Sequence, residues 1–167
     1  MPSRSIPVAS MVLAGVLLTA AMPASVQAAP ASPESRACAR ALKLLGLSTE
    51  VVVRVVDPEL AADPEAIRRV DAFLVRERDG RLRQIIYLNR RSAPVERALE
   101  GRDIDIAILA AIIRHEIEHL RGAGEPGARL AERAFFQGLV FAGRVPSDEG
   151  LAYLAELTQV VHLREAR

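Results

Sequence analysis

Several residue types are scarce or missing in this chain of 167 residues, and each shortage argues against a class of protein. Tryptophan is absent and aromatic residues make up only 4%, which argues against a platform for stacking nucleic-acid bases. A single cysteine cannot form an intramolecular disulfide, so the chain is not a disulfide scaffold. Basic and acidic residues balance at 22 and 21, which leaves no strong field to attract nucleic acid or an anionic membrane. Only three histidines are present, so their positions are informative.

Apolar residues make up 50% of the chain, and part of that share lies at the N-terminus. One base, Arg4, precedes the apolar run 11–22, Pro23 interrupts the run, and the small residues Val26 and Ala28 precede a candidate cleavage point. This order is typical of a secretory signal peptide, and the run is shorter than the roughly 20 residues that a membrane span needs. We therefore predict cleavage after residue 28, a secreted or periplasmic protein, and no membrane span in the mature chain.

The remaining sequence predicts a single domain that contains a small sheet. Residues 29–33 are expected to form a flexible leader, and residues 34–167 one domain. The β-branched run 51–56 indicates a strand, and two further segments, 72–78 and 81–89, flank an Asp-Gly pair that is typical of a hairpin. We expect a mostly antiparallel sheet of about three strands.

Helical patterns dominate from residue 92 onward. Asp103 is a candidate cap for a helix that ends near Arg121, and the first half of this helix is apolar almost all round, so it must be buried centrally. Two further helices are expected, at 126–142 and from Ser147 to about Arg164. A small sheet packed on a buried helix, with further helices after it, is an α+β fold.

Two of the three histidines lie four residues apart in the motif His115-Glu116-x-x-His119, near the end of the buried helix. Residues i and i+4 share one helix face, so both imidazoles can reach the same metal ion. Glu116 is rotated off that line and can accept a proton from a water molecule bound to the metal. Polar groups on so apolar a helix need partners, which a metal ion provides. The motif predicts a Zn²⁺ site with Glu116 as the general base.

The longer pattern His115-Glu-x-x-His119-x-x-Gly122-x-x-Glu125 resembles the zincin metallopeptidases. Within the zincins it is similar to the metzincins, in which a glycine lets the chain turn so that a residue six positions after the second histidine reaches the zinc. The resemblance covers about residues 82–135 and implies a zinc peptidase whose third metal ligand is Glu125.

Two further points follow from the same resemblance. In zincins an extended substrate lies along the strand that precedes the active helix, which implies such a role for residues 83–89. The last methionine of the chain is Met22, so the Met-turn of the metzincins is absent, and the likeness is to the broader zincin group.

A second zincin arrangement takes its third ligand, a glutamate, from the following helix. If helices 104–121 and 126–142 form a tight hairpin, a rise of 1.5 Å per residue places the level of the metal opposite about residue 131, which favours Glu132. Glu125 is preferred and Glu132 stays open as the alternative. The glutamate that does not bind the metal is expected to hydrogen-bond a ligating histidine.

The predicted function is an exported zinc metallopeptidase acting on a peptide or protein substrate. Candidate hydrogen-bond donors to an oxyanion are Tyr87, Tyr153 and His162. Cys38 is a candidate zinc ligand that would keep the enzyme latent. The alternative function is a non-catalytic, zinc-stabilised binding module of the cell envelope, whose closed site of four ligands would include Cys38 or both glutamates. Nothing in the sequence specifies an oligomeric state.

Overall fold

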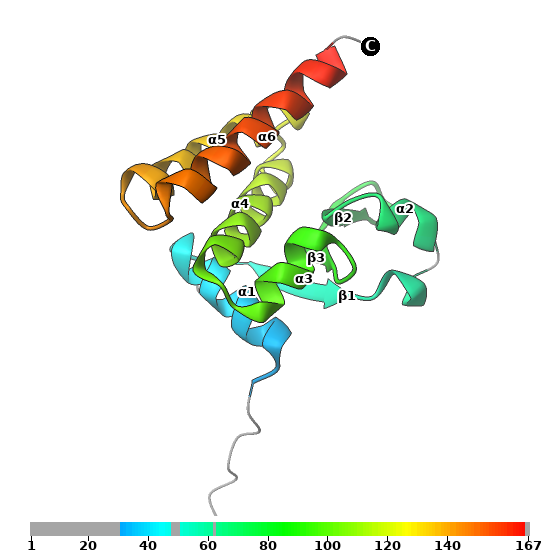
Figure 1. Cartoon of the computed structure of the whole chain (residues 1–167). Helices are drawn as coiled ribbons and strands as arrows, with labels where there is room; N and C mark the ends of the chain where they lie inside the picture. The colour runs from blue at the N-terminus through cyan, green and yellow to red at the C-terminus, as the bar shows by residue number, and fades with distance from the viewer. Residues whose placement is uncertain (1–30, 48–50, 62, 166–167) are drawn as a thin grey trace, which may run out of the picture. The chain divides into compact units, whose positions relative to one another are not determined.

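The computed structural model describes residues 31–47, 51–61 and 63–165 (Figure 1). The predicted signal peptide, residues 1–28, and the first two residues of the predicted leader lie outside this part of the chain and stay predictions. Helix α1 (Pro33–Leu44) begins directly after Ser32, whose hydroxyl oxygen accepts a hydrogen bond from the backbone N–H of Ser35. A proline in the first turn costs this helix no hydrogen bond, because the first N–H groups of a helix have no partner within it.

Three strands form a mixed sheet in the order β1-β3-β2, with the bounds β1 (Val52–Val56), β2 (Ala72–Arg76) and β3 (Leu82–Asn89). Strands β2 and β3 pair antiparallel, which confirms the predicted hairpin. Within the hairpin loop the N–H of Gly80 donates to the carbonyl of Glu77, and Gly80 has the positive φ that glycine adopts readily.

Strand β1 pairs parallel with β3, so the sheet is mixed where a mostly antiparallel one was predicted. After β1 the chain passes through a 3₁₀ turn, η1 (Pro58–Leu60), and the short helix α2 (Pro64–Arg68) before it enters β2. The hairpin then brings β3 back between the two earlier strands, in the same direction as β1. A run of valines suits parallel and antiparallel pairing alike, so the sequence of β1 did not distinguish them.

Helix α4 (Asp103–Leu120) is the central element of the described fold. Every residue from Ile104 to Ile113 is buried, and the helix packs against α1, α3 (Ala93–Glu100), α5 and strands β2 and β3. This confirms the predicted buried helix. Its first residue is Asp103, which was predicted as the cap; Arg102 occupies the cap position instead, and the Asp103 carboxylate pairs with Arg40 of α1.

Helices α5 (Glu125–Phe141) and α6 (Ser147–Glu165) follow, with α5 packed on α4 and α6 packed on α5. Phe136 of α5 is fully buried, and its ring meets the ring of Tyr153 edge to face at a centroid distance of 4.6 Å. The predicted α+β class is confirmed. Within the described residues, none of the helices has the length and apolar character that a membrane crossing requires.

The turn between α4 and α5 brings the start of α5 back toward the end of α4. Gly122 has a φ of 90°, its N–H donates to the carbonyl of His119, and the N–H of Ala123 donates to the carbonyl of Glu118. These two bonds form a Schellman motif, which stops a helix sharply and favours glycine at the left-handed position. The chain therefore reverses within a few residues, and α5 begins at Glu125.

Replacing Gly122 with alanine is expected to destabilise the protein by about 1–2 kcal/mol, because a left-handed conformation costs that much for a residue with a Cβ atom. No atom lies within 4 Å of the added Cβ, so steric overlap contributes nothing. The same substitution at Gly138, inside α5 and equally open, is expected to stabilise by about 0.5–1 kcal/mol. Urea denaturation measures both free energies of unfolding, and changes of equal sign would contradict this account.

Candidate metal centre

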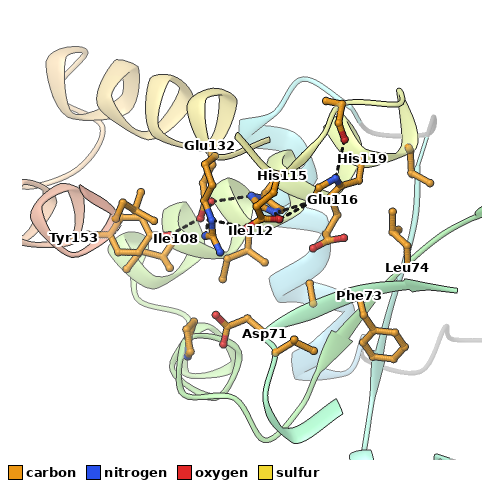
Figure 2. Close-up of a pocket in the computed structure, with 18 of the residues that line it drawn as sticks. Asp71, Phe73, Leu74, Ile108, Ile112, His115, Glu116, His119, Glu132 and Tyr153 are labelled. Atoms are coloured by element: carbon orange, nitrogen blue, oxygen red, sulfur yellow. Dashed lines mark hydrogen bonds and ion pairs between the residues drawn. The ribbon is translucent and has the colours of Figure 1, made fainter. Parts of the chain in front are cut away.

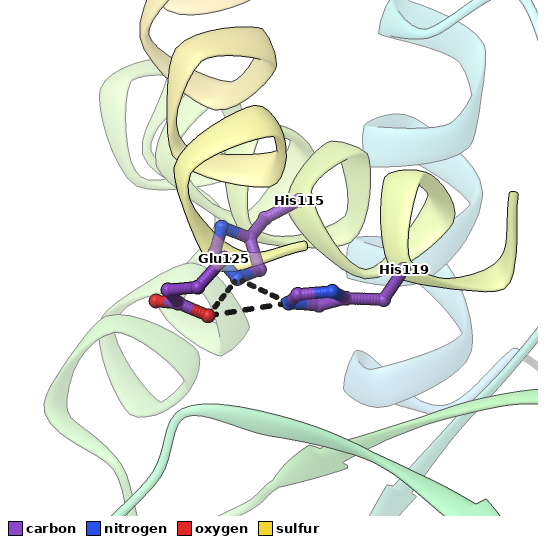
Figure 3. Close-up of side chains that lie close together, drawn as sticks. All are labelled: His115, His119 and Glu125. Carbon is purple, nitrogen blue, oxygen red and sulfur yellow. Dashed lines mark hydrogen bonds and ion pairs between the residues drawn. The ribbon is translucent and has the colours of Figure 1, made fainter. Parts of the chain in front are cut away.

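His115, His119 and Glu125 bring three possible ligand atoms to one point (Figure 3). The Nε2 atoms of the two histidines, one turn apart on α4, lie 3.1 Å from each other. The Oε2 atom of Glu125, from the first residue of α5, lies 3.5 Å from Nε2 of His115 and 3.3 Å from Nε2 of His119. The structure thus assembles three of the predicted site residues across the Gly122 turn.

These three separations can be compared with those that a zinc ion imposes. Protein nitrogen and oxygen ligands lie about 2.0–2.1 Å from Zn²⁺ in tetrahedral geometry, which separates neighbouring ligand atoms by about 3.3–3.4 Å. The observed separations of 3.1, 3.3 and 3.5 Å lie close to that value. An ion placed at the shared centre would meet all three atoms at normal bond lengths.

The hydrogen bonds on the far side of each imidazole fix its tautomer. Nδ1 of His115 lies 3.0 Å from Oε2 of Glu132, and Nδ1 of His119 lies 2.9 Å from the carbonyl oxygen of Ala123. Both partners are acceptors, so each Nδ1 carries the proton, and in a neutral imidazole the Nε2 atom then has a free lone pair. Two lone pairs and a carboxylate oxygen face one another, an arrangement that a cation stabilises. The donor set therefore fits a metal ion.

Glu132 lies behind His115 rather than among the three converging atoms. Its side chain is 3% exposed and accepts hydrogen bonds from Nδ1 of His115, from Nη1 of Arg129 at 3.0 Å and from the hydroxyl of Tyr153 at 3.1 Å. Burial raises the pKa of Tyr153 and the adjacent carboxylate raises it further, so the phenol stays protonated and donates. Of the two glutamates considered from the sequence, Glu125 lies with the two converging nitrogen atoms and Glu132 lies beside a histidine.

Glu125 is held in its ionised form. Partial burial acts to raise its pKa, but the attraction of the Arg129 guanidinium and of the two histidines outweighs burial, and the net pKa lies below the ordinary value. Nε of Arg129 donates to Oε1 of Glu125 at 3.0 Å, the oxygen that does not face the histidines. Sequence reasoning missed Arg129, although its spacing of four residues after Glu125 and three before Glu132 places all three on one helix face.

Glu116 lies beside the histidines on the cleft side of α4 (Figure 2). The residue is 8% exposed, and this burial raises the pKa of its carboxyl group above the ordinary value. The neighbouring carboxylates of Glu125 and Glu132 act in the same direction, while the two histidines oppose them. A carboxylate with a raised pKa is a better proton acceptor near neutral pH than an exposed one.

A cleft of about 1460 Å³ is lined in part by His115, Glu116, His119 and Glu125. Its walls come from α4, from strand β2, from the first part of α5 and from α6, and Figure 2 shows Ile108 and Ile112 of α4 between the histidines and Tyr153. Along α4 the lining continues on both sides of His115, from Ile104 to Leu120. The candidate site is therefore part of a long open groove and not a closed cavity.

The strand along which the substrate was expected to lie, residues 83–89, is not at the edge of the sheet. Strand β3, which includes residues 83–89, lies between β1 and β2, so both of its edges are paired. Among the described residues β2 is an outer strand of this sheet, and its residues 72–74 line the cleft. The sequence predicted a substrate along the strand that precedes α4; Leu82 and Gln84 of that strand do line the cleft, but the outer strand beside the cleft is β2.

The remaining candidates are two tyrosines, one histidine and the cysteine. Tyr87 stacks on Phe73 at a ring distance of 5.3 Å, and the hydroxyl of Tyr153 donates a hydrogen bond to Glu132. His162 belongs to a stretch of α6 whose side chains are outside the described part of the structure. Cys38 packs in the hydrophobic core, where burial raises the pKa of its thiol to about 11, and it is not among the residues that line the cleft.

No family model, curated protein or solved structure matches this chain. The chemistry of the site therefore rests on its own geometry.

Zn²⁺ is expected to stabilise the folded chain, because an ion that binds only the native state adds about 2.7 kcal/mol at a concentration of 100 times Kd. The His119→Ala variant should lose this increment, since one of the three converging atoms is removed. Urea unfolding with zinc and with a chelator measures the increment in both proteins. A wild-type chain whose stability is the same in the two conditions would contradict the metal site.

The two glutamates are expected to differ in their effect on zinc affinity. Glu125→Ala removes a proposed ligand and should abolish tight binding, whereas Glu132→Gln replaces the carboxylate beside His115 with an uncharged amide and should weaken binding about 10–100-fold. Competition with a chromophoric chelator measures both affinities. The reverse order of effects would make Glu132 the ligand.

Proposed function

We propose that this chain is an exported zinc metallopeptidase. The observation that carries the proposal is the convergence of two lone-pair nitrogens and one carboxylate oxygen, at separations suited to a tetrahedral zinc ion, in the wall of a long cleft. Export is inferred from the signal-peptide pattern of residues 1–28.

Three ligands favour a catalytic over a structural metal. Structural zinc sites are usually closed by four protein ligands, whereas catalytic sites have three and leave a position for water or substrate. Within the described residues the converging group comprises His115, His119 and Glu125, while Glu132 faces the other side of the His115 ring. The alternative of a closed site in a binding module required Cys38 or both glutamates as ligands, and the geometry of neither supports it.

Glu116 is the proposed general base. A bound Zn²⁺ would polarise the scissile carbonyl group and lower the pKa of a water molecule toward about 7. Glu116, one residue after the first proposed ligand and on the cleft side of α4, would accept a proton from a water molecule there and deliver it to the leaving amine. Its burial supports this role, because a carboxylate with a raised pKa both accepts and releases a proton more readily near neutral pH.

An extended peptide is the substrate that the cleft suits best. Strand β2 offers backbone groups along its outer edge, to which a peptide can add as a further strand. Ile108 and Ile112 form an apolar floor between that edge and the helices, which favours apolar side chains near the cleaved bond. The lining extends from His115 back to Ile104, about 16 Å along the helix, and forward to Leu120. A peptide substrate can therefore continue on both sides of the metal site, which favours cleavage of internal bonds.

Glu116→Gln is expected to keep zinc affinity and lower the rate of hydrolysis at least about 100-fold, because the amide cannot accept the proton. Cleavage of fluorescein-labelled casein measures the rate, and chelator competition measures the zinc affinity. Glu118→Gln is the matched control, since Glu118 lies on the same helix, pairs with Arg114 and Arg121, and does not line the cleft.

The two variants separate the proposed function from its alternative. Full activity of Glu116→Gln would exclude Glu116 as the base. A wild-type chain that binds zinc but cleaves neither casein nor a mixture of short peptides would favour the non-catalytic module.

A further inference from the structure

Arg129 links the two glutamates that compete for the metal. It lies on α5 four residues after Glu125 and three before Glu132, so the three side chains share one face of the helix. Its Nε donates to Oε1 of Glu125 and its Nη1 donates to Oε2 of Glu132, each at 3.0 Å. The Arg129 side chain is 28% exposed and that of Glu132 is 3% exposed, so the ion pair between them is screened less than an ion pair at the surface.

The two contacts divide the carboxylate oxygens between different tasks. Oε1 of Glu125 is held by Arg129 while Oε2 faces the two histidine Nε2 atoms, so one oxygen is left to bind a metal. Oε2 of Glu132 is shared by Arg129 and Nδ1 of His115, and its Oε1 accepts from Tyr153. Both oxygens of Glu132 are thereby kept on the far side of the His115 ring.

Charge gives a second reason for a cation at this position. Glu116, Glu125 and Glu132 place three carboxylates around the histidines, and the charges of Glu125 and Glu132 both act on Glu116. A bound divalent ion would neutralise two of the three charges, and the Arg129 guanidinium would neutralise the remaining one. Without Arg129, the neighbouring carboxylates of Glu125 and Glu132 would repel each other, and Glu132 would have no cation to hold it away from the metal.

We propose that Arg129 is a positioning residue that assigns the ligand role to Glu125 and the histidine-orienting role to Glu132. This inference rests on the proposed zinc site and adds a determinant of its affinity and ligand geometry. An arginine suits the task because its planar fork presents Nε and Nη donors in fixed directions, so one side chain can hold two carboxylates at once. A lysine would supply the charge as a single point and could not hold both carboxylates in this geometry.

The test uses the mature chain with Arg129→Gln, Arg129→Lys and, as a matched control, Arg133→Gln. Arg133 is exposed, lies on the same helix and does not line the cleft. Zinc affinity is measured by chelator competition, and the ligand arrangement by the visible absorption of the Co²⁺-substituted protein, which depends on the number and geometry of its ligands. Urea denaturation of the metal-free proteins reports folding separately.

Arg129→Gln is expected to weaken zinc binding about 10–100-fold and to change the intensity of the Co²⁺ spectrum, as Glu125 becomes free to bind through both oxygens. Arg129→Lys should restore part of the affinity, and Arg133→Gln should match the wild type. If Arg129→Gln does not fold, the double variant Arg129→Gln/Glu132→Gln removes both charges of this ion pair and is compared with Glu132→Gln alone; the same loss of affinity and the same spectral change are expected between these two.

Three outcomes would overturn the inference. Wild-type zinc affinity together with an unchanged Co²⁺ spectrum in Arg129→Gln would do so while leaving the proposed peptidase intact. Equal zinc affinities and equal Co²⁺ spectra for the double variant and Glu132→Gln would also overturn it. A wild-type chain that binds no zinc would overturn the proposed function as well.

Discussion

The imidazoles of His115 and His119 each donate a hydrogen bond through Nδ1, so their Nε2 lone pairs point at one carboxylate oxygen of Glu125. The rest of the site depends on this arrangement. His115 and His119 cannot turn away without losing the acceptors behind them, Glu132 and the carbonyl of Ala123. Those acceptors are provided by different elements, α5 and the turn after α4. The site therefore exists only when the two helices and the turn between them are formed together.

Burial of α4 provides the rigidity that this arrangement needs. The helix is enclosed by α1, α3, α5 and the sheet, so the two histidines are carried on a backbone that has little freedom to move. A position fixed to within a fraction of an ångström is what a metal site requires, and helices provide it better than loops do. His115, Glu116 and His119 lie in the last part of α4, while residues 104–113 are apolar apart from Asp105.

Much of this could be predicted from the sequence, because the signals were local. The buried helix, the hairpin and the spacing of His115 and His119 each follow from residues that are close in the chain. The choice between Glu125 and Glu132 did not follow from neighbouring residues, because it depends on how sharply the chain reverses at Gly122. Helix-rise arithmetic placed Glu132 near the level of a metal between His115 and His119, but could not show that its carboxylate meets Nδ1 of His115 and not Nε2. The parallel pairing of β1 was equally hidden, since it depends on the path of the connection between strands.

Strand β2 has a property that works against the protein as well as for it. An outer strand that can accept a peptide can also accept the same strand of a second copy, which is the first step of edge-to-edge aggregation. In β2 the regular pairing with β3 runs only over Ala72–Leu74 before the register shifts ahead of Arg76. Such an irregularity twists the strand and interrupts its row of backbone groups. The edge is long enough to pair with a few residues of the proposed peptide substrate, yet too short and too irregular to pair with further copies into a continuous sheet.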